Sequence, residues 1–260
     1  MSVTDMWSEA KHAQFMAQGY LRLGKVLGDE ELVALQGRID AIMLGEIPYP
    51  KMQFQMDGKT GAYEKMEPNT LGNKGASLAY RRITGLEQDP LFLAYMQHPI
   101  FRAITAYYMG ENVSVFRAMF MNKPAHQGTV LPWHQDIGEG WGLDQNPITT
   151  VWTALDDASP KNGCMQVVVG SNNLGILNPN HYTSETDQAK YATADKIIDI
   201  EAEAGEAILL HNWLMHRSGV NQTGSPRRAL SVAYMDASTR KMRTAQTFPV
   251  VFGENALQPL

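Results

Sequence analysis

Apolar residues recur at helical spacing in the early region of the chain. After Asp29 they follow at intervals of three and four residues, at Leu32, Leu35, Ile39, Ile42 and Met43. Gly45 and Pro48 end this predicted helix. The stretch 50–80 that follows is rich in glycine, and it predicts a loop region with weak strands.

Further helical segments lie on either side of this one. A short helix is expected over 8–18 with Ser8 as its N-cap, and a strand is expected at 20–23. An apolar face over 91–109 predicts helix again. Because proline removes a backbone donor and clashes with the preceding turn, we expect this segment to fall into two pieces at Pro99.

From residue 112 onward the pattern changes to short extended runs rich in β-branched and aromatic residues. The runs that predict strands are 113–116, 118–121, 149–155, 165–169, 207–210 and 229–234. Turns rich in Gly, Pro, Asn and Asp separate them. Strands at such spacing are typical of an antiparallel sandwich or barrel. The predicted fold class is therefore mainly β with peripheral α-helices.

The length of the chain is compatible with this organisation. A chain of 260 residues can form one large domain or two small ones. A β-barrel with added helices fits this length, so we expect a single domain over 1–260. Residues 1–110 are expected to be mostly helical and loop-rich, and 111–260 to form the β core that carries the chemistry.

Composition and charge exclude several classes of protein. An apolar content of 44% and a charged content of 19% are typical of a globular chain. The net charge of −5, without a block of Lys or Arg, argues against a nucleic-acid partner. Cys164 is the single cysteine, so no internal disulfide can form. The start lacks the pattern of a signal peptide and no apolar run is long enough for a membrane span, so we expect a soluble, cytoplasmic protein with no membrane partner.

The strongest chemical pattern is a His-x-Asp pair with a distant histidine. His134 and Asp136 stand two positions apart, which places their side chains on one face of a strand, and His216 follows far downstream. Two imidazoles and one carboxylate on one face of a metal are the ligand set of non-haem Fe(II) oxygenases. Arg227 comes eleven residues after His216 and can hold a carboxylate bidentately. The alternative is a hydrogen-bonded loop histidine at 134 and a turn-capping carboxylate at 136.

Taken in order, these motifs resemble the phytanoyl-CoA dioxygenase family of Fe(II)/2-oxoglutarate oxygenases. The segments that carry the resemblance are 122–124, 133–136, 152–157, 162–165, 170–171, 205–206, 216–221 and Arg227. They cover about 115–235, and weaker similarity extends over most of the chain. The resemblance implies a double-stranded β-helix, or jelly-roll, core with helices packed outside it. It also implies Fe(II) as cofactor, 2-oxoglutarate as cosubstrate and O2 as oxidant.

The resemblance assigns roles to individual residues. His134, Asp136 and His216 match the iron ligands, Arg227 matches the arginine that pairs with the C5 carboxylate of 2-oxoglutarate, and Ser218 matches a hydroxyl that assists it. Related halogenases have a small residue in place of the carboxylate, so Asp136 favours oxygen transfer or another oxidation over halogenation.

One position departs from the pattern of the family. Asn172 stands where the family commonly has a histidine after Gly-Ser, which puts any substrate role of that imidazole in doubt.

Several neighbouring residues are candidates for further contacts. Lys123 can approach a carboxylate of the cosubstrate or substrate, although a surface lysine is an equal alternative, and Thr149 with Thr150 can contact the cosubstrate from a strand that lines the barrel. Arg228 is the alternative anchor to Arg227, because neighbouring side chains on a strand point to opposite faces.

Other residues close to the predicted site have structural alternatives. We expect His211 to be structural or to lie behind the ligands, and Trp133 and Trp213 either to form apolar walls of the site or to serve ordinary packing. For Arg81 and Arg82 we favour a solvated pair over contact with an anionic substrate. The segment 173–194 is long enough to act as a lid over the opening.

These observations favour a dioxygenase that hydroxylates an unactivated C–H of a small molecule, with release of succinate and CO2. Alternatives that use the same oxidant are desaturation, cyclisation or endoperoxidation of a secondary metabolite. A non-catalytic jelly-roll binding protein would keep the fold but lack iron-dependent turnover, and a zinc hydrolase or isomerase would have no use for Arg227. The substrate and the oligomeric state are left open by the sequence.

Overall fold

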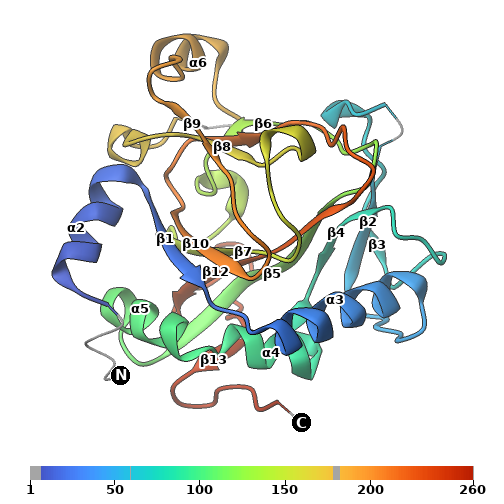
Figure 1. The fold of residues 1–260 in the computed structure, drawn as a ribbon. Coiled ribbons are helices and arrows are strands. Elements are labelled where there is room, and N and C mark those ends of the chain that lie inside the picture. Colours follow the sequence, from blue (N-terminus) through green and yellow to red (C-terminus); the bar gives the residue numbers. More distant parts are fainter. Residues whose placement is uncertain (1–6, 59, 178–181, 260) are drawn as a thin grey trace.

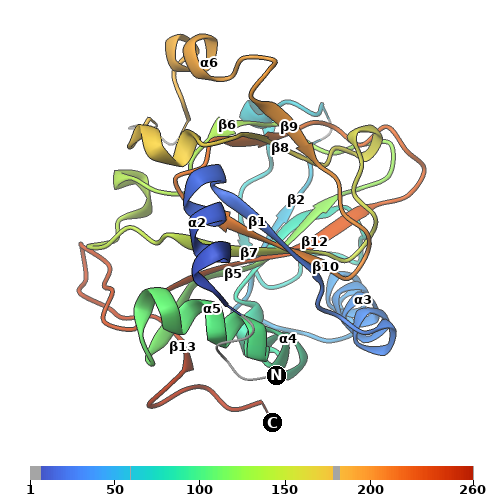
Figure 2. The same ribbon diagram turned by 60° about the vertical axis from the view of Figure 1, so that its left-hand side comes forward.

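The fold consists of two facing antiparallel β-sheets with helices against the outer face of the larger sheet (Figures 1 and 2). The computed structural model describes residues 7–58, 60–177 and 182–259. The small sheet lies above the large one in both views, and α3, α4 and α5 lie below it. This is the jelly-roll arrangement, so the predicted fold class is confirmed.

The large sheet has nine strands and mixes segments from both halves of the chain. Its order is β1-β10-β7-β12-β5-β4-β2-β3, with β13 also paired to β5. The strands are β1 (Tyr20–Lys25), β2 (Gln53–Met56), β3 (Thr70–Leu71), β4 (Tyr80–Thr84), β5 (Val113–Lys123), β7 (Thr149–Ala154), β10 (Glu206–His211), β12 (Arg227–Asp236) and β13 (Val250–Phe252). The two runs expected at 113–116 and 118–121 are one continuous strand, β5, which pairs along its length with β12.

The small sheet has the order β6-β11-β8-β9. Its strands are β6 (Leu131–His134), β8 (Met165–Val168), β9 (Ile197–Ile200) and β11 (His216–Ser218). Strand β6 agrees with the expectation that His134 lies on a strand, whereas β9 and β11 were not predicted. They have three or four residues each, so neither is long enough to show a clear alternation of apolar and polar positions.

The helices begin and end close to where the sequence predicts. They are α2 (Glu9–Gln18), α3 (Asp29–Leu44), α4 (Pro90–Met96), α5 (Pro99–Met109) and α6 (Glu185–Tyr191), with 3-10 turns at Tyr63–Lys65, Leu86–Gln88, Glu139–Trp141, Pro160–Asn162 and Ser171–Leu174. The Ser8 hydroxyl accepts a hydrogen bond from the Lys11 N–H, as expected of an N-cap. The expected break at Pro99 separates α4 from α5. Helix α6 lies within 173–194 and was not predicted.

Two apolar cores hold these layers together. One joins the outer face of the large sheet to the helices, and there the Tyr95 hydroxyl of α4 donates to Thr153 Oγ1 of β7 at 2.6 Å. The other lies between the two sheets and includes Trp152 and Met165. Because side chains alternate along a strand, β7 sends Trp152 inward and Thr153 outward. The inner space between the sheets is therefore where a site can form. Among the residues that the structure describes, no helix is long and apolar enough to cross a membrane.

Candidate active site

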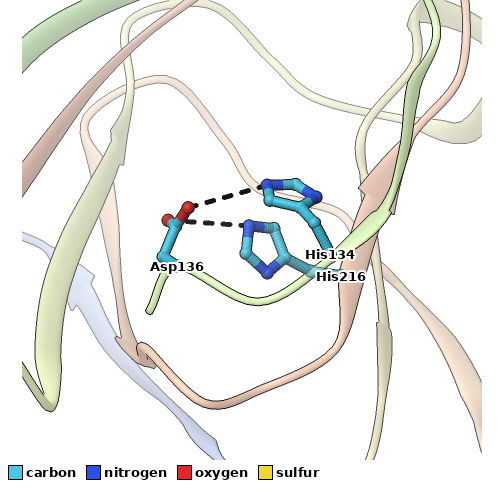
Figure 3. A group of neighbouring side chains, drawn as sticks. All are labelled: His134, Asp136 and His216. Carbon is cyan, nitrogen blue, oxygen red and sulfur yellow. Dashed lines mark ion pairs between the residues drawn. The ribbon is translucent and has the colours of Figure 1, made fainter. Parts of the chain in front are cut away.

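Two histidines from neighbouring strands of the small sheet face each other. His134 is the last residue of β6, His216 is the first of β11, and the two are direct partners in the antiparallel register. Directly opposite residues on antiparallel strands project to the same face. Asp136 lies two positions beyond the end of β6, and its carboxylate turns back towards both rings (Figure 3). The three side chains named by the His-x-Asp and distant-His pattern are thus brought together.

The geometry of these three side chains fits one metal ion. The Asp136 carboxylate oxygens lie 3.6 Å from His134 Nε2 and 3.7 Å from His216 Nε2. All the ligand atoms lie within 4.8 Å of one another. Two atoms that each bind an ion at about 2.1 Å stand at most about 4.2 Å apart, so a single ion can contact the carboxylate and either imidazole. Among the described residues no other group of His, Cys, Asp and Glu meets this criterion.

The protein orients both imidazoles for metal binding. His134 Nδ1 lies 2.8 Å from the Pro132 carbonyl oxygen, and His216 Nδ1 lies 2.9 Å from the Leu214 carbonyl oxygen. A carbonyl can only accept, so each Nδ1 carries the proton and each Nε2 presents its lone pair to the point between the rings and the carboxylate. Both rings use the carbonyl two residues earlier in the chain.

The backbone of Asp136 is fixed by the turn after β10. The Asp136 N–H donates to the Asn212 carbonyl at 2.8 Å, and Asn212 Nδ2 donates to the Asp136 carbonyl at 3.1 Å. Thr150 on β7 in turn donates through Oγ1 to Asn212 Oδ1 at 3.2 Å. Asn212 is 1% exposed, so the backbone that carries this carboxylate is held by a buried network outside regular strand structure. Sequence reasoning missed this role, because Asn212 lies far from Asp136 in the chain and no local pattern links the two.

Gln135, between the two ligands, points away from them, as the alternation of a strand requires. Its Nε2 donates to the carbonyls of Gly175 and Trp213 at 2.9 and 2.7 Å, and its Oε1 accepts from the Leu177 N–H at 2.7 Å. The side chain is fully buried. It therefore ties the metal-binding segment to the beginning of 173–194.

A cavity between the sheets opens onto the three ligands. Its lining includes Arg227 and Ser218 as well as His134, Asp136 and His216. Ser218 lies on β11 two positions after His216, on the same face. Arg227 and Ser218, the predicted carboxylate anchor and its assisting hydroxyl, therefore line the same cavity as the three candidate metal ligands.

Arg227 is buried and keeps donors available. It is 5% exposed, its Nη2 donates to the Gly163 carbonyl at 3.0 Å, and its Nε has no hydrogen-bond partner within the described residues. Burial lowers the pKa of Arg227 to about 10, which still leaves the guanidinium charged at neutral pH. An orphaned buried N–H is costly, so this side chain suits a ligand that carries an acceptor.

Arg228 points the other way. Its guanidinium pairs with Asp156 and Asp40, each at 2.8 Å. These two carboxylates occupy it outside the cavity, and it does not line the cavity. The placement favours Arg227 over Arg228 as the cavity arginine.

Two predicted cosubstrate contacts lie elsewhere. Trp152 of β7 faces the cavity, so Thr153 next to it faces the helices. Thr149 is fully buried and lies on the same face of the strand as Thr153, away from the cavity. Lys123 pairs in register with Arg227, but its Nζ donates to the Thr129 carbonyl at 2.8 Å, and it does not line the cavity. Burial, followed by the positive charges of Arg227 and Arg81, lowers the pKa of Lys123 well below its usual value. The alternative of a surface lysine is wrong, since Lys123 is 5% exposed.

The other neighbouring candidates have structural roles. Asn172 Nδ2 donates to the Met16 carbonyl at the end of α2, so it caps a helix and does not line the cavity. His211 is buried against Phe15, outside the ligand group. Trp133 packs with Val168 and Met215 in a separate apolar cluster.

The tryptophan that lines the cavity is Trp152, and neither Trp133 nor Trp213 does, which favours ordinary packing of the two alternatives expected for them. Residues 178–181 of the predicted lid lie outside the described residues. The described segment after them begins beside the site, because Tyr182 forms a β-bridge with His134. The lid itself stays a prediction.

The expectation that Arg81 and Arg82 form a solvated pair is wrong. Both line the cavity, and Arg81 is only 6% exposed, so they do not form a solvated pair. Arg117, which the sequence analysis did not single out, lines the same cavity. Its position could have been predicted from the alternation of β5, because Arg117 lies on the same face of that strand as Met119 and Met121.

A jelly-roll core that holds two imidazoles and one carboxylate around a single point defines the class of non-haem Fe(II) oxygenases. The profile of the family described as phytanoyl-CoA dioxygenase (PhyH) matches residues 15–229. The chain belongs to the phytanoyl-CoA dioxygenase family, and it is thereby an Fe(II)/2-oxoglutarate-dependent dioxygenase that acts on a small molecule.

Individual relatives agree with the family. A probable phytanoyl-CoA dioxygenase of Caenorhabditis elegans is 26% identical over 83% of this chain and 71% of its own length. The peroxisomal phytanoyl-CoA dioxygenase of Mus musculus is 23% identical over 82% of this chain, which spans 64% of the mouse protein. An L-proline trans-4-hydroxylase of Streptomyces griseoviridis is 23% identical over 90% of this chain and 88% of its own.

Solved structures share the fold. The structure of EctD from S. alaskensis with 2-oxoglutarate and 5-hydroxyectoine superposes with a TM-score of 0.73 at 19% identity, over 98% of this chain and 86% of that one. The carbocyclase SnoK from nogalamycin biosynthesis gives a TM-score of 0.66 at 17% identity, over 95% and 90% of the two chains.

Proposed function

We propose that this chain hydroxylates an unactivated C–H of a small molecule, with His134, Asp136 and His216 holding Fe(II). The observation that carries the proposal is the convergence of two Nε2 lone pairs and one carboxylate at the cavity wall. Bound iron with 2-oxoglutarate supplies the activation of O2, and oxidative decarboxylation of the cosubstrate gives succinate and CO2. The chain as a whole is proposed to act as one domain, which the pairing of N-terminal β1 with β10 supports.

Arg227 is proposed to bind the far carboxylate of 2-oxoglutarate, with Ser218 assisting it. The guanidinium is charged, buried and short of acceptors, and the Ser218 hydroxyl lines the same cavity. A fork of N–H donors suits a carboxylate, and the low dielectric of a buried site strengthens the pairing. The Arg227 guanidinium also lies 5.8 Å from the Trp152 ring, which limits its movement. The buried placement of Thr149 and Lys123 leaves both out of this proposed site.

The remaining residues of the site are proposed to position the reaction and exclude water. Apolar side chains line the cavity between the sheets, so a substrate bound there displaces solvent from the metal side. The buried Asn212 and Gln135 hold the ligand segment, so the carboxylate and the imidazoles keep their arrangement while substrate and product exchange. Placement of this kind is the main contribution of a protein whose cofactor performs the difficult chemistry.

The test is iron-dependent release of succinate from 2-oxoglutarate. We expect Fe(II) to support it and Zn(II) not to, which separates an oxygenase from a zinc hydrolase or a non-catalytic binding protein. Asp136→Ala and His216→Ala should abolish the activity, whereas Asp29→Ala, whose side chain is 87% exposed, should not change it. Undiminished turnover by Asp136→Ala would disprove the assignment. Analysis of the oxidised product then separates hydroxylation from desaturation, cyclisation and endoperoxidation.

A cytoplasmic location is also included in this proposal, and the single cysteine is compatible with it. Fractionation of the producing cells tests it independently of the activity.

A further inference from the structure

The cavity contains more positive charge than the proposed cosubstrate needs. Besides Arg227, its lining includes Arg81, Arg82, Arg117 and Arg217. Among the described residues Asp136 is the one carboxylate that lines it, and the charge of Asp57 acts on Arg81. With ferrous iron and 2-oxoglutarate bound, the charges of these two groups cancel, and the five guanidinium groups outweigh the two carboxylates by three charges. Arg81 and Arg227 are buried and the other three are partly buried, and an excess of charge taken out of water is costly unless a ligand of opposite sign compensates it.

Arg217 donates through Nε to Gln166 Oε1 at 2.7 Å, and the other three additional arginines also have neutral partners. Arg81 Nη1 donates to Gln55 Oε1 at 2.9 Å, and Arg82 Nη2 donates to Asn69 Oδ1 at 2.9 Å. The Arg117 guanidinium lies over the Trp141 ring at 4.6 Å. Within the described residues none of the three makes an ion pair. Each guanidinium has five N–H donors, so most of them stay available to a ligand.

The backbone of β4 explains why two adjacent arginines line one cavity. In the pairing of β4 with β2, Arg82 is opposite Gln55 and Tyr80 is opposite Met56, so Arg81 is an extra residue. Such a β-bulge re-aims a side chain that alternation would send to the other face. Arg82 also pairs in register with Met121 of β5, which lines the cavity on the same side as Arg117.

The three candidate metal ligands line the same cavity as these arginines. The charge of Asp136 acts on Arg117, partly opposing the lowering of the Arg117 pKa by burial, and Arg82 acts on it as well. An anion held there would lie beside the iron site. Apolar residues complete the lining, namely Met119, Met121, Leu131, Trp152, Met165 and Leu210.

We propose that the substrate is a small organic oxyanion with an apolar body, whose acid group is bound inside the cavity by Arg82 and Arg117, with Arg81 behind them. This inference rests on the proposed function for its account of the iron and 2-oxoglutarate. The acid group can be a carboxylate or a phosphate, since both match the fork of a guanidinium. Because Arg81 is 6% exposed, the acid must enter the cavity, so the substrate is the free acid and not an ester that carries its charge on a distant handle.

The experiment compares ligands that share one body and differ in the head group. Hexanoate, hexyl phosphate, hexanamide and hexanoyl-coenzyme A are titrated calorimetrically into the full chain, and benzoate, phenyl phosphate and benzamide form a second series. Each titration is done with metal-free protein and again with Mn(II) and 2-oxoglutarate without O2. We expect an acid to bind at least about tenfold more tightly than its amide and than the thioester, which corresponds to a lost hydrogen bond to a charged group. Preference for the carboxylate or the phosphate identifies the acid.

Variants assign the binding to the arginines. Arg82→Gln and Arg117→Gln should each weaken binding of the preferred acid by about tenfold or more, and Arg82→Lys should weaken it less. Arg243→Gln, at an exposed position, is the matched control and should bind as the unchanged chain does. Thermal melting confirms that each variant is folded.

Two outcomes overturn the inference: acids that bind no more tightly than amides in both series, or arginine variants that bind the acid unchanged. Because the metal-free titration needs no turnover, acid binding without succinate release would disprove the proposed function alone. Succinate release without acid preference would disprove this inference alone.

Discussion

His134 and His216 face each other across the β6–β11 pair, with ring centroids 4.0 Å apart. Each ring is held by the carbonyl two residues before it, so the two strands present a matched pair of Nε2 atoms. Antiparallel register alone brings these rings together, although 81 residues separate them in the chain. Asp136 completes the set from the turn beyond β6.

The two adjacent arginines of β12 should respond differently to the same substitution. Arg227→Gln should raise the KM for 2-oxoglutarate by about ten- to hundredfold, because one charged anchor is lost. Arg228→Gln should leave this KM unchanged but lower the free energy of unfolding by about 2 kcal/mol, because Asp40 and Asp156 lose their partner. Steady-state kinetics and urea unfolding of both variants measure this. The reverse pattern would make Arg228 the anchor.

Asn212 should act as a positioning residue for the metal. Asn212→Ala removes the bond from Nδ2 to the Asp136 carbonyl, and we expect the affinity for Fe(II) or Mn(II) to fall by about tenfold or more. Metal titration under anaerobic conditions measures it. Asn173→Ala is the matched control, because that exposed side chain bonds to the end of α2 and not to the site. Equal metal affinity in both variants would show that Asn212 serves stability alone.

His211 should make stability depend on pH below neutrality. Burial lowers the pKa of His211 to about 4, whereas the unfolded chain titrates at about 6.5. Below pH 6.5 the unfolded state binds the proton and the folded state does not. The contribution of His211 is therefore complete above about pH 6.5 and is lost as the pH falls towards 4, by up to about 3 kcal/mol.

The measurement is urea unfolding at several pH values, for the unchanged chain and for His211→Gln. Glutamine does not titrate, and it can still accept the bond that His211 Nδ1 receives from the Trp213 N–H. The difference in unfolding free energy between the two proteins should change with pH over this window. A constant difference would contradict the prediction.

Gly19 should tolerate no side chain. It ends α2 with φ +81°, and a Cβ there would lie 2.5 Å from Leu214 Cδ1 and 2.6 Å from Asn172 Oδ1. Gly19→Ala should destabilise the chain by about 1–3 kcal/mol in thermal or urea unfolding. Gly37→Ala is the control, since Gly37 lies in α3 with open space around it and helix propensity favours alanine by about 0.5–1 kcal/mol. Similar effects at both sites would contradict the account of this helix end.

The sequence predicted the long elements and the metal ligands well. The 3.6-residue periodicity after Asp29 indicated α3, and Pro99 separated α4 from α5, because these signals are local. His134, Asp136 and His216 were found because few residue types bind iron, and their order along the chain resembles a family. A strand at His134 was expected, but its partner β11, which carries His216, was missed, since the pairing of the two strands depends on residues distant in the chain.

The cavity lining was predicted less well, for reasons of local geometry. Thr149 was expected to contact the cosubstrate. In β7, however, Trp152 points to the inner face, so Thr149 points to the outer one. Arg81 and Arg82 were expected to form a solvated pair, but both line the cavity. The bulge in β4 that allows it has no signature in a single sequence, because it is defined by the partner strand.

The extra residue at Arg81 also suggests how such an enzyme can acquire a new substrate range. A strand shifted by one position exchanges its two faces, so loss of one codon near Arg81 would turn one of these guanidinium groups towards the apolar helical layer. A single insertion or deletion can thus remove or restore a recognition group while the iron ligands, on the opposite sheet, keep their places. When related sequences are compared, insertions and deletions near Arg81 should therefore show changes in ligand preference more clearly than substitutions do.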